Sequence, residues 1–170
     1  MTAIAIAPSD DLQALSAVAR GTFLESFADV IPAADILARA DEEDSPQGIA
    51  ALLRGGGAAW LASVEATGAP VGFALLRAPQ LPEVETFADD LELKRIYLFH
   101  RFQGGGTGLR LLRTAEAEAR RRAARRLLLG VHKENDAVSW YRRQGFAVIG
   151  ERAFRVGTQY FGDFIMAKAL

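Results

Sequence analysis

A run of glycines between two apolar segments is the part of this sequence best suited to chemistry. Gln103-Gly104-Gly105-Gly106-Thr107-Gly108 follows an apolar run at Leu91–Leu98 that predicts a buried strand. From Leu109 the apolar residues recur at three- and four-residue spacing, which predicts a helix. The start of a helix offers free N–H groups and a positive dipole end to an anion. Four glycines in five residues are costly unless a ligand comes close, so we expect a phosphate-binding loop here.

Two common phosphate motifs do not fit this spacing. A dinucleotide fingerprint needs glycines at positions one, three and six, and the sixth position from Gly104 is Leu109. The acidic residue expected about twenty positions further on is missing from an Arg-rich region. A Walker A loop needs Lys and then Ser or Thr after its last glycine, whereas Gly108 is followed by Leu109. The pattern that does fit is Gln-x-x-Gly-x-Gly, formed by Gln103, Gly106 and Gly108.

A second informative stretch lies after the next predicted strand. It reads Asn135-Asp136-Ala137-Val138-Ser139-Trp140-Tyr141 and is followed by Gly145-Phe146. We expect Asn135 to be the N-cap of a short helix that ends near Gln144. Ala137 and Tyr141 are four residues apart and therefore share one face of that helix.

Together the two motifs resemble those of the GCN5-related N-acetyltransferases (GNAT family), in the same order and with a strand between them. The resemblance spans Leu91 to Phe146. It implies an α/β fold with a mixed sheet of about seven mostly antiparallel strands, splayed between the fourth and fifth strands, with helices on both faces. The tail resembles the bacterial spermine/spermidine-type acetyltransferases, through Gly150, Phe154, Gly157, Asp163 and Met166.

The resemblance also implies acetyl-CoA as the acetyl donor. The pantetheine arm would enter the splay and pair with main-chain groups of the fourth strand, as an added strand does. The glycine loop would hold the pyrophosphate through its amides, and the second motif would contact the arm. The residues expected to contact acetyl-CoA are Ile96, Tyr97, Leu98, Gln103, Gly104, Gly105, Gly106, Thr107, Gly108, Leu109, Asn135, Ala137 and Tyr141.

Acetyl transfer to an amine requires proton transfer at two places. An amine with a pKa near 10.4 is neutral in only about one molecule in two thousand at pH 7, which corresponds to roughly 4–5 kcal/mol of barrier. Glu92 is the candidate base, because residues 92, 94, 96 and 98 would share one strand face near the thioester. Tyr141 matches the family's usual acid for the departing sulfur, and the N–H near Leu98 would polarise the carbonyl.

Each of these assignments has a structural alternative. Tyr141 could be a packed core phenol. Glu92 could be an ordinary ion-paired carboxylate, because Lys94 and Arg95 lie beside it in the sequence.

Composition narrows the class of protein. The 170 residues fit one domain, 1–170, half of the residues are hydrophobic, and the net charge of −1 gives no basic field for nucleic acid. There is no cysteine and there are only two histidines, so we expect no metal site and no thiol nucleophile. We expect neither a signal peptide nor a membrane span, and a cytoplasmic protein.

Apolar periodicity and turn residues predict alternating strands and helices along the chain. We expect strands at Ala3–Ala7, Ala58–Val64, Val71–Arg77, Leu91–Leu98, Arg126–Val131, from Phe146 and at Tyr160–Leu170. We expect helices at Leu12–Phe27, from Pro32, from Ser45, from Leu109 to about Arg122, and from Asn135 to Gln144.

The favoured function is transfer of an acetyl group from acetyl-CoA to a primary amine by direct attack. The acceptor would be a small polyamine or a peptide or protein amine. The alternative is an acyl-CoA-binding regulatory module with the same fold and no turnover, and a nucleotide binder is a more distant third. By analogy with the family, the protein would form a homodimer.

Overall fold

The computed structural model describes residues 2–170, which form seven strands and five α-helices. The strands are β1 (Ile4–Pro8), β2 (Ala58–Val64), β3 (Pro70–Arg77), β4 (Asp90–Leu98), β5 (Arg126–His132), β6 (Ala147–Val156) and β7 (Gln159–Ala169). The helices are α1 (Leu12–Phe27), α2 (Ala33–Glu42), α3 (Pro46–Leu53), α4 (Thr107–Arg121) and α5 (Ala137–Arg143). These elements follow the order that the sequence predicts, with boundaries that differ by a few residues.

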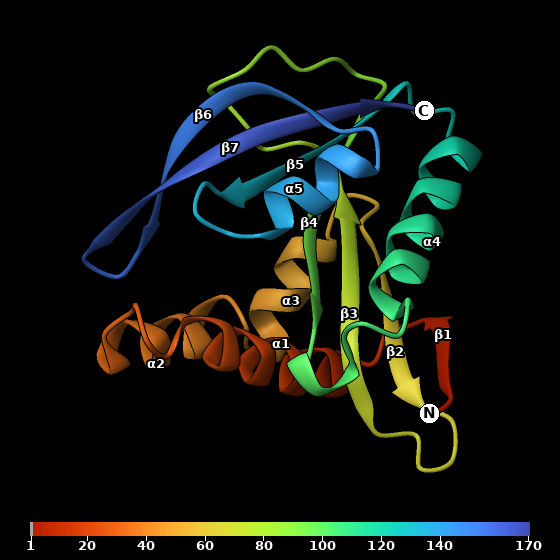
Figure 1. Cartoon of the computed structure of the whole chain (residues 1–170), viewed down its shortest axis with the longest axis vertical. Coiled ribbons are helices and arrows are strands. Elements are labelled where there is room, and N and C mark those ends of the chain that lie inside the picture. Colours follow the sequence, from red (N-terminus) through yellow and green to blue (C-terminus); the bar gives the residue numbers. More distant parts are fainter. Residues whose placement is uncertain (1) are drawn as a thin grey trace.

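The strands form one mixed sheet in the order β1-β2-β3-β4-β5-β7-β6 (Figure 1). All neighbouring strands are antiparallel except β4 and β5, which are parallel. Parallel strands need a crossover, and here α4 provides it. The last two strands form a long hairpin that turns at Gly157, which has φ +57°.

The sheet splits between its fourth and fifth strands. β4 and β5 pair only at Asp90–Arg126, Leu91–Leu127 and Glu92–Leu128. Beyond Glu92 the strands diverge, and Figure 1 shows β5, β6 and β7 running across the direction of β1–β4. The seven strands and this splay confirm the expected fold class.

Helices cover both faces of the sheet. On one face Leu111, Leu112 and Ala115 of α4 pack against the sheet in the largest hydrophobic cluster. On the other face α1 and α3 cover Phe73 and Leu75 of β3. The two apolar faces explain why the inner strands read as nearly continuous apolar runs.

A β-bulge in β4 reverses the alternation of its side chains. Leu93 pairs with Leu76 and Arg95 with Leu75, so Lys94 is an extra residue. As a result Leu93, Ile96 and Leu98 all pack in the cluster on the α4 side of the sheet. The expectation that residues 92, 94, 96 and 98 share one face is therefore wrong, because one inserted residue moves the following side chains to the opposite face. Glu92 lies on the face away from α4.

Two helix starts also differ from the sequence prediction. The crossover helix α4 begins at Thr107, two residues earlier than expected, and its N-cap Gly106 has a left-handed conformation. The N-cap position of α5 is Asp136, not Asn135. A short 3₁₀ turn at His100–Phe102 joins β4 to the glycine loop.

Candidate active site

The glycine loop lies between the end of β4 and the start of α4. Gly104 and Gly106 have φ angles of +79° and +82°, which other residues rarely adopt. Gly108 has no such constraint, and a Cβ added there would meet no atom within 4 Å. The protein's own packing thus gives no reason for a glycine at 108, whereas a ligand held close to the main chain does.

The outer half of β4 has one free edge. Phe99 N donates to Val71 O at 3.0 Å, so the main-chain groups of Phe99 and Tyr97 face β3. By alternation, the groups of Ile96 and Leu98 face the opening, where β5 has diverged. Gln103 Nε2 donates to Leu98 O at 2.9 Å, which closes the loop onto the strand end. This arrangement supports the expected pairing of Ile96 and Leu98 with an extended ligand.

Tyr141 comes to the site on α5. Its side chain is 7% exposed, and its ring packs edge-on against Trp140 and Phe146, with centroids 4.9 and 5.6 Å away. Burial raises the pKa of the Tyr141 phenol above its ordinary value of 10, and the nearby Tyr97 phenol raises it further. The hydroxyl is thus protonated at neutral pH and able to donate a proton or a hydrogen bond.

Asn135 and Ala137 shape the start of α5. Asn135 Oδ1 accepts from Ala137 N at 2.8 Å, whereas the Asp136 side chain makes no capping bond. Asn135 therefore stabilises the first turn from one position before the N-cap, and its side chain is held in place. Its contact with acetyl-CoA, like that of Ala137, stays a prediction.

Glu92 is an ion-paired carboxylate in this structure. It is 1% exposed and accepts from Arg77 Nε at 3.3 Å and from Gln80 N at 3.0 Å. Lys94 Nζ lies 3.7 Å from its other oxygen. The carboxylate lies at the last β4–β5 pair, where the splay begins. Its role as the base stays a prediction.

A second charged group lies on the same face, and the sequence analysis did not predict that its members come together. Asp163 of β7 is paired with His132 of β5 and with Arg152 of β6, so the three side chains share one face. Arg152 Nε and Nη2 donate to Asp163 Oδ2 at 3.2 and 3.1 Å, and His132 Nδ1 lies 3.9 Å from Asp163 Oδ1. Burial raises the pKa of Asp163, and Arg152 offsets part of that effect. No local pattern marks these residues, because strand register alone brings them together.

An ion-pair network connects the α2–α3 turn to β4. Arg95 Nη2 donates to Glu43 at 3.1 Å, Arg95 Nη1 also binds Asp44, and Arg39 Nη1 donates to Glu43 at 2.9 Å. Burial raises the pKa of the neighbouring Tyr97 phenol, while Arg39 and Arg95 act in the opposite direction. The network thus holds the α2–α3 turn against the strand that carries Ile96 and Leu98.

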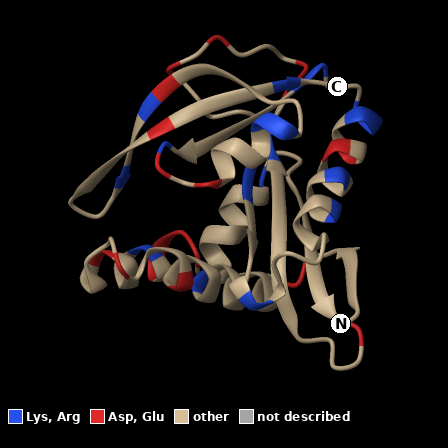
Figure 2. Ribbon diagram, viewed as in Figure 1, with Lys and Arg blue, Asp and Glu red and all other residues tan. Residues whose placement is uncertain are grey.

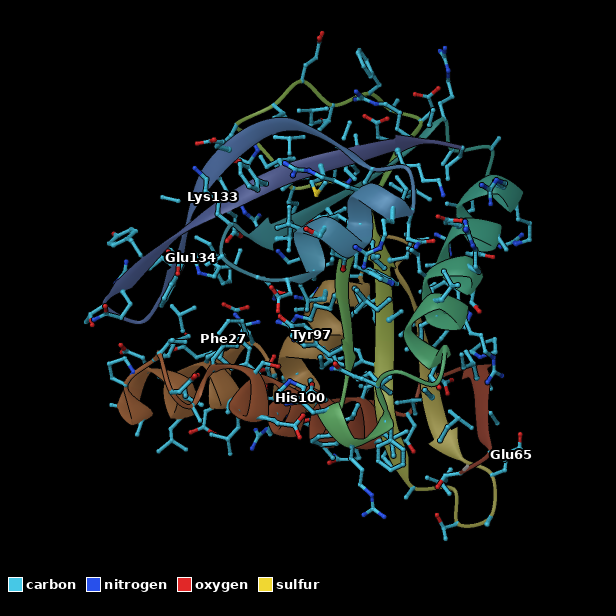
Figure 3. All side chains as sticks on the ribbon, viewed as in Figure 1. Phe27, Glu65, Tyr97, His100, Lys133 and Glu134 are labelled. Atoms are coloured by element: carbon cyan, nitrogen blue, oxygen red, sulfur yellow. The ribbon has the colours of Figure 1, made fainter. Side chains whose placement is uncertain are left out.

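Four of the side chains labelled in Figure 3 lie around the opening beside β4. Phe27 of α1 and Tyr97 of β4 lie on one side, and Lys133 and Glu134, which follow β5, lie on the other. A shallow hollow of about 390 Å³ on the β6–β7 hairpin includes Arg152 and Phe161. A hollow of about 600 Å³ lies at the other end of β4, beside Asp90 and Arg126, away from the glycine loop.

Two kinds of feature are absent from residues 2–170. No cluster of three or more His, Cys, Asp or Glu side chains is arranged to hold a metal ion. No helix in this range combines the length and the apolar character needed to span a membrane.

The chain is similar in sequence to known N-acetyltransferases. A family model described as "Acetyltransferase (GNAT) family" matches residues 24–146. An uncharacterized N-acetyltransferase of Lactobacillus delbrueckii subsp. lactis is 30% identical over 173 residues, covering 94% of this chain and 92% of its own. An uncharacterized N-acetyltransferase of Mycobacterium tuberculosis is 34% identical over 82 residues, 48% of this chain. That match spans only about half, 53%, of the mycobacterial relative's length.

Solved structures share the fold over the whole chain. The PaiA N-acetyltransferase of Thermoplasma acidophilum, in complex with coenzyme A, superposes with a TM-score of 0.76 at 24% identity and covers 99% of both chains. A ribosomal-protein-alanine N-acetyltransferase of Brucella melitensis gives a TM-score of 0.69 at 26% identity, also over 99% of both chains.

Proposed function

The chain belongs to the GNAT acetyltransferase family, and we propose that it transfers an acetyl group from acetyl-CoA to a primary amine. The observation that carries this proposal is the open edge of β4, which leads directly into the glycine loop with the Tyr141 phenol buried nearby. Main-chain groups at Ile96 and Leu98 would pair with the pantetheine arm, and the amides from Gly104 to Leu109 would bind the pyrophosphate.

The proposed reaction is direct. The amine nitrogen attacks the thioester carbonyl, a C–N bond forms and the C–S bond breaks. Tyr141 gives its proton to the departing sulfur, and the Leu98 N–H stabilises the developing oxyanion. The proton of the attacking amine goes to a carboxylate, for which Glu92 is the proposed base, directly or through one water. The low exposure of Glu92 favours the route through a water.

The acceptor is proposed only as a class of primary amines. A peptide amine is supported by the Brucella relative, which is named for acetylating an alanine of a ribosomal protein. A polyamine rests on the resemblance of the tail alone. We further propose that residues 1–170 are one domain and that the protein acts as a homodimer.

The direct test is release of CoA thiol from acetyl-CoA with a panel of polyamines, amino acids and short peptides with free amines. We expect rapid release with one class, and a Glu92→Gln variant that loses turnover most strongly below the pKa of the amine. Binding of acetyl-CoA without release for any amine would favour the non-catalytic module. Binding of ATP or NAD without binding of CoA would contradict the proposal altogether.

A further inference from the structure

The bulge in β4 leaves a lysine without a partner residue on β3. Lys94 is the extra residue between the Leu93–Leu76 and Arg95–Leu75 pairs. Bulges are common next to active sites. This bulge shifts the alternation from Arg95 onward, whereas Lys94 keeps the face of Glu92. Lys94 lies beside Glu92 on the face away from α4, just beyond the point where β4 and β5 separate. Its side chain is only 19% exposed.

Lys94 has no hydrogen-bond acceptor of its own within residues 2–170. The nearest carboxylate oxygen, Glu92 Oε1, is 3.7 Å from Nζ. That carboxylate already accepts from Arg77 Nε and Gln80 N through its other oxygen. A mostly buried ammonium with so little compensation is costly.

Arg152 brings a second positive group to the same opening. A Cβ added at Gly130 would lie 2.8 Å from Arg152 Cζ, so the guanidinium rests against the β5 main chain where no side chain intervenes. Gly130 lies beyond the last β4–β5 pair, in the splayed part of β5. Arg152 bonds to Asp163 through one carboxylate oxygen only, Oδ2. Figure 2 shows the basic segment in the middle of β4 and the charged segments of β6 and β7.

Lys94 shares its nearest carboxylate with another cation, because Glu92 is also paired with Arg77. The charged and titratable groups here are Arg77 of β3, Glu92, Lys94 and Arg95 of β4, His132 of β5 with the exposed Glu134 after it, Arg152 of β6, Asp163 of β7, and Arg39, Glu43 and Asp44 of the α2–α3 region. Burial lowers the pKa of Lys94, and Arg152, Arg77 and Arg95 add to this, against the opposing effect of Glu92. The surroundings of Lys94 thus compensate its charge only in part, through one shared carboxylate at 3.7 Å.

We propose that Lys94 and Arg152 form an anion subsite for the acceptor, so that the acetylated amine carries a carboxylate or phosphate group. This inference rests on the proposed acetyl transfer and narrows its acceptor to small, amino-acid-like amines. An ammonium and a guanidinium on opposite sides of the opening can both donate to one carboxylate or phosphate. The same charges would repel a polyamine, which disfavours that acceptor class.

The subsite is distinct from the expected pyrophosphate site. Lys94 lies four residues before the end of β4, about 13 Å along the strand, and the glycine loop begins further on. Lys133 is a weaker candidate than Lys94, because it is already bonded to Glu151.

A titration of the lysines tests the subsite without turnover. The sequence has three lysines, so protein labelled with ¹³C-lysine gives three resolvable sets of side-chain signals, and Lys94→Gln identifies that of Lys94. With the glycine loop saturated by CoA, inorganic phosphate and, separately, glycine are added as probes. We expect either probe to raise the pKa of Lys94 and to leave Lys133 and Lys168 unchanged. An unchanged Lys94 pKa with both probes would overturn the proposal.

Kinetics then distinguish the acceptor class. Each acceptor amino acid is compared with its own amide, which keeps the amine and removes the negative charge. We expect Lys94→Gln to raise KM for the acid about tenfold or more and to leave the amide unaffected. Lys94→Arg should keep most of the preference, and the matched control Arg54→Gln, at an exposed helix end, should change nothing.

The outcomes separate this inference from the proposed function. Equal KM values for acid and amide, or faster turnover of polyamines, would contradict the anion subsite while leaving acetyl transfer intact. No turnover with any amine would contradict the proposed function, and the lysine titration would still decide whether the subsite binds anions.

Discussion

Burial keeps the Tyr141 phenol protonated, which suits it to donate a proton. A tyrosine with an ordinary pKa near 10 is already protonated at neutral pH, and burial raises the pKa of Tyr141 further. It is therefore a proton donor rather than a base over the whole physiological range. Trp140 and Phe146 pack against the ring and fix its position. The hydroxyl is therefore the only part of Tyr141 that can take part in proton transfer.

Replacing Tyr141 with Phe removes that hydroxyl and keeps the ring. We expect kcat to fall by about 10²-fold, the lower end of general acid catalysis, with the Kd for CoA within about twofold of the original. The raised pKa also predicts that the unmodified enzyme loses no rate through this group between pH 8 and 10. Steady-state rates and CoA titration measure both quantities, and an unaltered kcat would exclude Tyr141 as the acid.

Among the secondary-structure elements, α4 connects the two halves of the sheet through one buried carboxylate. Glu116 is fully buried and accepts from Lys168 of β7 and Arg113 of α4 at 2.6 and 2.7 Å. Arg113 in turn donates to Gln144 at the end of α5. Burial raises the pKa of Glu116, but the bonds from Lys168 and Arg113 outweigh it and hold the pKa below its usual range. The carboxylate thus ties α4 to β7 and to the helix that carries Tyr141.

We expect Glu116→Gln to lower the free energy of unfolding at pH 7 by about 2–4 kcal/mol, because it leaves Lys168 and Arg113 without their counter-charge. Since the folded-state pKa is depressed, this contribution is present above the unfolded value near 4.5 and is lost as the pH falls below it. Urea unfolding at pH 7 and pH 3 measures the difference. Glu65→Gln, at an exposed turn, is the matched control, and an equal effect of both variants would refute the assignment.

Gly108, in the first turn of α4, allows a separate test of the glycine loop. Alanine is a better helix former than glycine by about 1 kcal/mol, and a Cβ at this position meets no protein atom within 4 Å. Gly108→Ala should therefore raise thermal stability slightly. If the main chain here contacts a phosphate, the same change should weaken CoA binding about tenfold, since a methyl group would enter the ligand's space. Equal CoA affinity in the more stable variant would speak against the loop as the pyrophosphate site.

At the scale of the whole molecule, the two halves of the sheet share little main-chain pairing. Only three residue pairs connect β4 to β5. A ligand that pairs with the open edge of β4 would continue the sheet beyond these three pairs. Such a ligand would bind the folded chain and not the unfolded chain. Acetyl-CoA at about 100 times its Kd should then stabilise the fold by about 2.7 kcal/mol. Thermal unfolding with and without acetyl-CoA measures this, and an unmoved Tm would contradict binding in the splay.

Local patterns in the sequence predicted the strand, the glycine loop and the helix after it, as well as the pattern of Asn135 and Tyr141. These features depend on residues close in the chain, such as glycines that need positive φ angles at 104 and 106. The resemblance of the two motifs to the acetyltransferase family implied the splayed sheet and helices on both faces, and the structure confirms both. The same patterns placed most strand and helix boundaries within a few residues.

Only the tertiary structure decided which side chains share the open face of the sheet. The bulge at Lys94 exists because β3 and β4 pair with a shifted register, and it separated Glu92 from Ile96 and Leu98. Arg152 and Asp163 face each other through the register of the β6–β7 hairpin, and the pairing of β7 with the more distant β5 adds His132. Register depends on the packing of distant strands, and one residue of slip exchanges the two faces, so no local pattern could reveal this charged group.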